Sequence, residues 1–107
     1  MKINSTRHLG PDRDRFSCTV DGKTLTVVLR NAALFPNALG IDDIDMDRGI
    51  HVAFVDKPRK AEKQIAEPFS EAKAGDLVVL LYPGAESRKA TLAVLGVGDP
   101  GTVFDRR

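Results

Sequence analysis

The chain has 107 residues, 42% of them apolar and 29% charged, which suits one folded globular domain and excludes a disordered chain or a pair of domains. Its 16 lysines and arginines against 15 aspartates and glutamates leave a formal net charge of +1, which excludes an overall field drawing the protein to nucleic acid or anionic lipid. The single cysteine excludes an intramolecular disulfide, and the longest apolar run is far shorter than the roughly 20 residues of a membrane-spanning helix, so we expect a cytoplasmic protein.

Residues 1–15 are predicted to form a flexible leader. They are polar, carry a Gly-Pro pair at positions 10 and 11, and follow neither the helical nor the strand period. They also lack the apolar stretch of a signal peptide. Ordered structure is expected over residues 16–107, as a single β-rich domain.

The strongest local pattern is a β-hairpin. Two alternating segments, Phe16 to Val20 and Lys23 to Leu29, flank Asp21-Gly22, a pair that tolerates the positive φ angles of a two-residue type I′ turn. In this register the apolar side chains share one face and the hydroxyl side chains share the other. The predicted cross-strand pairs are Val20 with Lys23, Cys18 with Leu25, Phe16 with Val27, Thr19 with Thr24 and Ser17 with Thr26.

The middle of the chain combines a loop, a strand and a segment with two interpretations. Proline, asparagine and glycine interrupt residues 30–40, which predicts a loop. Ile50 to Val55 is predicted to be a strand, with Ile50, Val52 and Phe54 on one side. The charged segment 56–75 is either a solvated loop or contains a short helix over 59–67 that ends before Pro68 and places Ala61 and Ile65 on one face.

The last third of the chain is predicted to form a second hairpin. Leu77 to Tyr82 is a continuous apolar run typical of a central strand covered on both faces. Pro83-Gly84 suits a type II turn, after which Lys89 to Val97 is expected to return as a strand and residues 102–104 to form a short edge strand. The fold class we predict is mainly β, a small antiparallel β-barrel or sandwich of five to six strands with at most one short helix.

Three glycines at positions 96, 98 and 101 match the spacing of a dinucleotide-binding loop. That loop works because a helix N-terminus follows it and presents N–H groups to the pyrophosphate, and too few residues follow Gly101 to form such a helix. We therefore expect a turn there and no bound cofactor.

An acidic run covers Asp42, Asp43, Asp45 and Asp47, and the last three share the alternating carboxylates of a calcium loop. The glycine of such a loop arrives one position late, however, and Phe54 stands where the bidentate glutamate belongs. Weak cation binding is one interpretation, and the favoured one is a solvated loop or an electrostatic docking surface.

Neither catalysis nor metal binding is supported by the spacing of reactive residues. His8 and His51 lack zinc-type partners, and no acid, base and nucleophile arrangement is evident. Cys18 would need a neighbouring base to act as a nucleophile, and its inward position in the hairpin favours a buried, inert thiol. We expect a protein that is not an enzyme and that holds no metal.

Four basic residues, Lys57, Arg59, Lys60 and Lys63, are candidates for a local phosphate-binding patch. Neighbouring glutamates dilute their charge, and aromatic side chains for base stacking are scarce. A small nucleic-acid-binding or regulatory β-barrel is therefore the alternative function.

The order of the predicted elements resembles the small head–tail joining or attachment proteins of tailed bacteriophages and prophages. The similarity is carried by Phe16 to Leu29, Gly49 to Val55, Ala74 to Leu80, and Leu92 to Thr102 with its Val97-Gly98-Asp99-Pro100-Gly101 ending. The amphipathic helix that often opens such proteins is absent, and the strand after Gly-Asp lacks a clear aromatic residue.

The resemblance implies a structural subunit of a ring at the portal end of a capsid, located in the virion. Its partners would be other proteins or further copies of itself, and the acidic run and the basic residues of 57–63 would meet across neighbouring subunits. The function predicted from the sequence is accordingly a non-catalytic interaction module for virion assembly.

Overall fold

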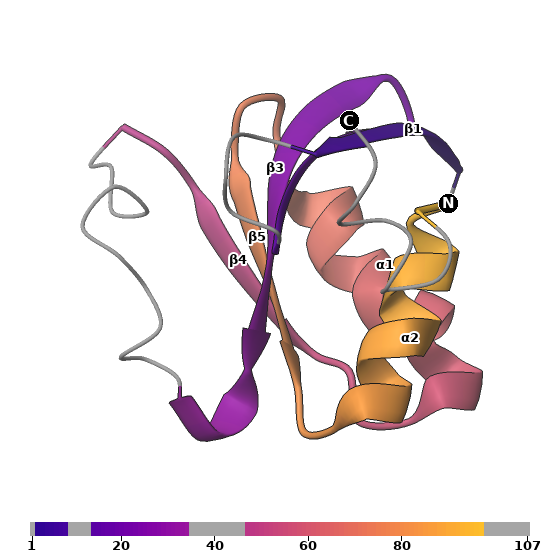
Figure 1. Cartoon of the computed structure of the whole chain (residues 1–107). Coiled ribbons are helices and arrows are strands. Elements are labelled where there is room, and N and C mark those ends of the chain that lie inside the picture. Colours follow the sequence, from indigo (N-terminus) through magenta and orange to yellow (C-terminus); the bar gives the residue numbers. More distant parts are fainter. Residues whose placement is uncertain (1, 9–13, 35–46, 98–107) are drawn as a thin grey trace.

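The computed structural model describes residues 2–8, 14–34 and 47–97, and its framework is a five-stranded mixed sheet in the order β1-β2-β3-β5-β4 (Figure 1). The strands are β1 (Ile3–His8), β2 (Arg15–Val20), β3 (Lys23–Asn31), β4 (Ile50–Phe54) and β5 (Leu77–Tyr82). The helices are α1 (Ala61–Glu71) and α2 (Ala85–Val94), with short 3₁₀ turns η1 (Ala32–Leu34) and η3 (Pro58–Lys60).

The sheet is open, so the predicted antiparallel barrel or sandwich is wrong. β1, β2 and β3 are antiparallel neighbours, but β5 runs parallel to both β3 and β4. A parallel pair requires a crossover connection, and α1 provides it between β4 and β5. Both helices lie on the same side of the sheet (Figure 1), which makes this an α/β fold.

The first hairpin is confirmed in its register and its turn. Val20 pairs with Lys23 and Cys18 with Leu25, as the two-residue loop requires. Asp21 has φ 50° and Gly22 has φ 81°, the positive angles of a type I′ turn. The turn residues and the alternation of apolar side chains predict the same register, and both are local properties of the chain.

The expected leader contains strand β1, which pairs antiparallel with β2. The N–H of Asp21 donates to the carbonyl of Lys2 at 2.9 Å, and the N–H of Lys2 donates to the Asp21 carboxylate at 2.8 Å. Ile3 of this strand packs against the core. Backbone pairing joins β1 to β2, and it does not depend on side-chain type, so the sequence of the strand shows no alternating pattern.

The predicted second hairpin is also wrong, because residues 85–94 form α2. Burial follows the helical period rather than alternation, with Ser87, Thr91, Leu92 and Leu95 all buried. Gly96, at φ 77°, ends the helix, and the N–H that follows it bonds back to the carbonyl of Leu92 at 3.0 Å. The turn and edge strand predicted after position 97 lie outside the described residues.

Of the two interpretations of 56–75, the helix is the one present, although it covers 61–71 rather than 59–67. Ala61 and Ile65 are buried on one face as predicted, and Phe69 continues that face. Pro68 does not end the helix, because proline keeps a helical φ and costs chiefly one backbone hydrogen bond in the last turn. Burial of Phe69 compensates for that loss.

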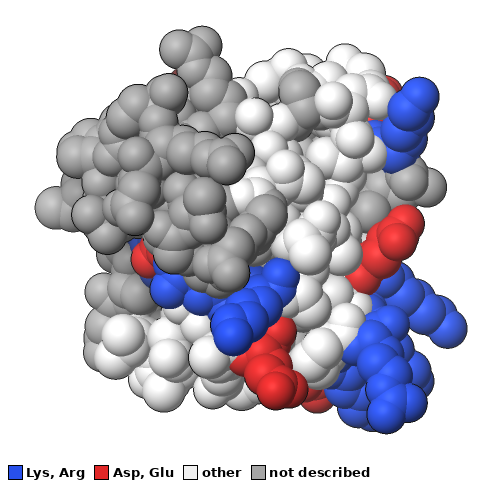
Figure 2. Space-filling view, turned by 45° about the vertical axis from the view of Figure 1, so that its right-hand side comes forward, with Lys and Arg blue, Asp and Glu red and all other residues white. Residues whose placement is uncertain are grey.

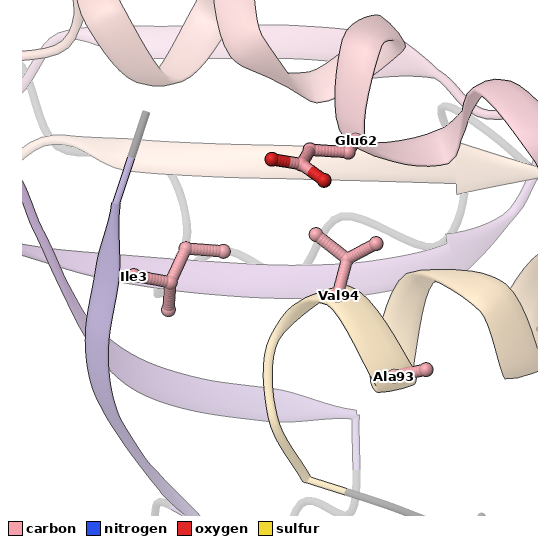
Figure 3. A pocket seen from close by; sticks show the side chains of 4 residues that line it. All are labelled: Ile3, Glu62, Ala93 and Val94. Carbon is pink, nitrogen blue, oxygen red and sulfur yellow. The ribbon is translucent and has the colours of Figure 1, made fainter.

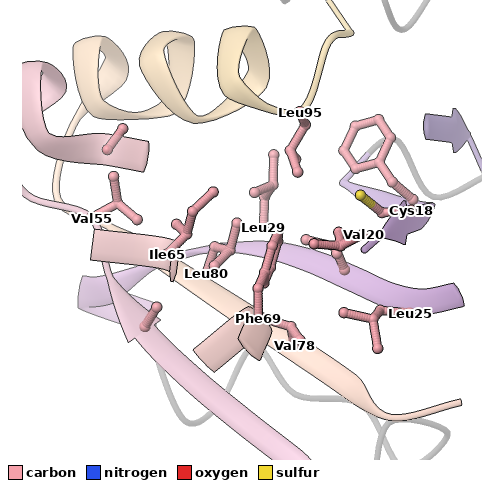
Figure 4. Close-up of a cluster of buried hydrophobic side chains, with 14 of the residues drawn as sticks. Cys18, Val20, Leu25, Leu29, Val55, Ile65, Phe69, Val78, Leu80 and Leu95 are labelled. Atoms are coloured by element: carbon pink, nitrogen blue, oxygen red, sulfur yellow. The ribbon is translucent and has the colours of Figure 1, made fainter. Parts of the chain in front are cut away.

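The larger core cluster lies between the sheet and the two helices (Figure 4), and a smaller one, Val28, Leu77, Val79 and Leu81, is buried on the other face of the sheet. Leu29 and Leu80 of the sheet pack against Ile65 and Phe69 of α1, and Leu95 closes the cluster after α2. Fully burying one such side chain contributes about 1.5–3 kcal/mol. β5 lies inside the sheet and all six of its residues are buried, as its apolar run predicted.

No helix in the described part of the chain is long and apolar enough to cross a bilayer.

Candidate functional site: the free edge of β4

β4 ends the sheet, and within the described residues only β5 pairs with it. The carbonyl of Gly49 accepts from the N–H of Leu77 at 2.9 Å, and the N–H of Val55 donates to the carbonyl of Leu81 at 2.7 Å. Backbone groups of successive strand residues point to alternate sides. Ile50, Val52 and Phe54 therefore direct their N–H and C=O groups away from β5, to the free edge.

The same three residues carry exposed apolar side chains. Ile50 is 41% exposed, and Val52 and Phe54 are 49% exposed each. Their side chains lie on the sheet face turned away from the helices, which we call the distal face, while Ala53 and Val55 are buried on the helix side. Proteins usually shield an edge strand with charge or proline, so three exposed apolar residues on this edge make it the candidate site.

On the helix side, a groove of about 470 Å³ runs along β4. It is lined by all five residues of the strand and by Gln64, Glu67, Pro68 and Glu71 of α1. Glu67 and Glu71 are exposed. We call this the β4–α1 groove, and its helix wall is anionic.

A hydrogen-bonded carboxylate anchors the start of β4. Nε2 of His51 lies 2.8 Å from Oδ2 of Asp76, and Asp76 also accepts from the backbone N–H groups of Lys73 at 2.9 Å and Gly49 at 3.2 Å. The backbone bond from Lys73, followed by the bond from His51, lowers the pKa of Asp76 below its ordinary value. The carboxylate thus ties the segment before β4 to the turn before β5.

Sequence reasoning missed both this anchor and the free edge. His51 appeared only as a strand residue without a metal partner, and Asp76 only as the residue before a buried run. Their pairing joins positions 25 residues apart. The one trace of this contact in the sequence is Gly49, because a Cβ atom there would lie 2.6 Å from the Asp76 carboxylate and would have to displace it.

The predicted charged surfaces are only partly described. Asp42, Asp43 and Asp45 lie outside the described residues, while Asp47 is exposed just before β4. The basic residues are all exposed, three of them in or beside η3 and the fourth in the first turn of α1: Lys57, Arg59, Lys60 and Lys63. Figure 2 shows basic side chains gathered at the lower end of the molecule. Asp47 and the basic residues therefore flank opposite ends of β4.

Two further hollows have fewer polar groups that could bind or react with a ligand. A cavity of about 390 Å³ is lined by Ile3, Ala93, Val94 and Glu62, and the carboxylate of Glu62 points into the space between Ile3 and Val94 (Figure 3). A single carboxylate among apolar groups offers no acid and base pair. The other hollow, about 340 Å³, lies along residues 56–60 and is open to the basic side chains there.

Cys18 is fully buried, as its hairpin position predicted. Burial raises the pKa of its thiol to about 11, so the nucleophilic thiolate is scarce at neutral pH. Within residues 2–8, 14–34 and 47–97, no three His, Cys, Asp or Glu side chains are grouped to hold a metal ion.

Comparison with family models, curated proteins and solved structures finds no match to this chain. The function must therefore be argued from the chemistry of the β4 edge and its surroundings.

Proposed function

We propose that this protein is a non-catalytic interaction module that binds another protein chain by adding a strand to the free edge of β4. The observation that carries the proposal is that Ile50, Val52 and Phe54 combine outward backbone groups with exposed apolar side chains. Backbone hydrogen bonds to an added strand supply affinity, and alternate side chains supply specificity.

The anchor beneath the strand supports this role. Asp76 holds both Gly49 and His51, so the beginning of β4 is ordered before any partner arrives. A preordered edge lowers the entropy cost of association. The strand is therefore suited to act as a template.

Attachment to a neighbouring virion protein is a specific case of this proposal and stays a prediction. An open sheet has two edges, so copies joined from β4 to β1 would make heterologous contacts of the kind that close into rings. Ile3 is the one large apolar residue of β1, however, and a copy's β1 would offer little to the apolar side chains of β4. The observations favour a different protein chain as the partner.

The alternative, nucleic-acid binding, would use the exposed residues Lys57, Arg59, Lys60 and Lys63. Base stacking would require exposed aromatic rings. Phe16, Phe69 and Tyr82 are buried, so Phe54 is the one exposed aromatic ring among the described residues, and a single ring cannot stack a run of successive bases. Binding to a DNA or RNA oligonucleotide that falls linearly with the logarithm of salt concentration would favour this alternative.

The test of the proposed function uses Val52→Pro. Proline lacks an N–H, and the N–H of residue 52 points to the free edge, so this change blocks an added strand without removing a bond to β5. Val52→Lys blocks the same edge by charge. A partner protein that co-purifies with the wild-type protein is isolated. Its affinity for the wild type and for each variant is then measured by calorimetry.

Both variants are expected to weaken the complex by about tenfold or more, because a hydrogen bond or a desolvated apolar contact is lost at the centre of the strand. The matched control is Asn4→Lys, which adds the same charge to the other edge strand and should leave affinity unchanged. In the complex, the amides of residues 50, 52 and 54 should exchange more slowly. Unchanged affinity in both folded Val52 variants would refute the proposal.

A further inference from the structure

A strand added to β4 would present its two faces to chemically different surfaces. Side chains opposite Ile50, Val52 and Phe54 would lie on the distal face, beside three exposed apolar residues. The intervening side chains would enter the β4–α1 groove, where Glu67 and Glu71 stand on the helix wall. The distal face therefore favours apolar side chains, and the groove favours cationic ones.

The two groove carboxylates are available to a partner. Glu67 and Glu71 are exposed, and neither side chain forms a hydrogen bond or ion pair with the described part of the chain. Placed four positions apart on α1, they are separated along the helix by about 6 Å, at a rise of about 1.5 Å per residue. Alternate residues of a strand are separated by nearly the same distance, about 6.6 Å.

We propose that the segment bound at β4 is an extended stretch of a partner protein in which apolar and cationic residues alternate. This inference rests on the proposed function of the β4 edge and names the chemistry of its partner. The apolar residues cover the exposed side chains of the distal face. Two cations, two positions apart in the segment, match the spacing of Glu67 and Glu71.

A second copy of this chain fits the site less well. Two β4 strands paired antiparallel about Val52 would match apolar side chains on the distal face, with Ile50 opposite Phe54 of the other copy. On the helix side, however, the carboxylates of one α1 would approach those of the other. The strand residues on that side are His51, already bonded to Asp76, and Ala53, so neither copy supplies the cations.

The test compares labelled nine-residue peptides by fluorescence polarisation and by amide shifts of the isotope-labelled protein. One peptide alternates valine with lysine, a second alternates valine with serine and a third alternates valine with glutamate. A fourth has the composition of the first in two blocks. The expected order of affinity places the valine–lysine peptide at least about tenfold above the valine–glutamate peptide, with shifts centred on residues 50–54.

The protein variants separate charge from strand addition. The double variant Glu67→Gln, Glu71→Gln is expected to weaken the valine–lysine peptide by about 3- to 10-fold, the effect of losing two exposed ion pairs. It should leave the valine–serine peptide unchanged. Val52→Pro should weaken both peptides, because it removes an edge N–H that either would use.

Three results would overturn the inference. If the valine–lysine and valine–serine peptides bind equally and Val52→Pro weakens both, the site has no preference for cations, although the proposed function of the β4 edge is retained. A doubling of mass in light scattering that Val52→Pro abolishes makes a second copy the occupant, again with the proposed function intact. If the alternating and block peptides cause amide shift changes of equal size, or if no amide of residues 50–54 shifts, then no alternating strand binds at this edge.

Discussion

Gly49 lies so close to Asp76 that a Cβ atom at position 49 would stand 2.6 Å from the Asp76 carboxylate oxygen. This close approach lets the carboxylate accept the N–H of Gly49 while also bonding His51 and the N–H of Lys73. One aspartate thereby aligns the first residues of the edge strand with its neighbour β5. This contact, together with the backbone pairing of β4 with β5, places the start of the proposed binding strand.

Gly49→Ala is expected to destabilise the fold by about 1–3 kcal/mol, because the added methyl must displace the carboxylate or the backbone. Urea unfolding measures the change. Gly84→Ala is the control, since a Cβ there meets nothing within 4 Å. In an Asp76→Ala background the cost of Gly49→Ala should shrink, and an undiminished cost would show that the clash is not with this carboxylate.

The Asp76 carboxylate should make stability depend on pH in acid. Its pKa is lowered in the folded protein, so the stability that it contributes is fully present above its unfolded pKa, near 3.9, and is lost as the pH falls through the lower folded pKa. Asp76→Asn should therefore be less stable than the wild type at pH 7, and the difference should narrow below about pH 4. A difference that stays constant from pH 7 to strong acid would contradict this assignment.

Lys23 caps the C-terminus of α1 from the hairpin. Its Nζ donates to the carbonyls of Phe69 at 3.1 Å, Ser70 at 3.2 Å and Ala72 at 2.8 Å, where the helix leaves acceptors unpaired. Lys23→Met keeps most of the aliphatic stem and removes the donors, so we expect a loss of about 1–2 kcal/mol in urea unfolding. Lys73→Met, at an exposed lysine nearby, is the control. Equal effects of the two substitutions would exclude a specific cap.

A buried position on the helix side of the sheet and a half-exposed position of the edge strand should respond differently to truncation. Leu80→Ala empties part of the core under the helices and should cost about 2–5 kcal/mol of unfolding free energy. Val52→Ala trims a half-exposed side chain and should change stability by only about 0.5 kcal/mol. Thermal and urea unfolding of both variants checks this contrast. A large loss in Val52→Ala would mean that the distal side chains serve folding rather than binding.

Several elements were predictable from the sequence because their causes are local. The turn at Asp21-Gly22 sets the hairpin register through backbone angles that only a few residue types adopt. The alternation of residues 50–55 and the continuous apolar run of 77–82 similarly revealed β4 and a buried strand. Each of these patterns needs no knowledge of a distant partner.

Other patterns were ambiguous until the partners were known. Residues 85–94 carry apolar positions that suit either a strand or a helix, and the helix prevails because Leu92 and Leu95 complete the layer over the sheet. Strand β1 is polar and joins the sheet through backbone bonds, which leave no mark on side-chain pattern. The prediction of a barrel was wrong because the parallel pairing of β5 with β3 and β4 joins segments that are distant in the sequence, and such pairing also leaves no mark on side-chain pattern.

By itself the sequence determined where the hairpin turns, which side chains of β4 share a face, and that 77–82 is buried. Only the tertiary structure decided that β4 is an edge strand, that its apolar side chains Ile50, Val52 and Phe54 remain exposed, and that Glu67 and Glu71 stand beside it. Alternation assigns residues to two faces but does not say which face a helix covers or which edge a neighbour fills. Those outcomes depend on contacts between segments far apart in the chain, and the candidate site consists of such contacts.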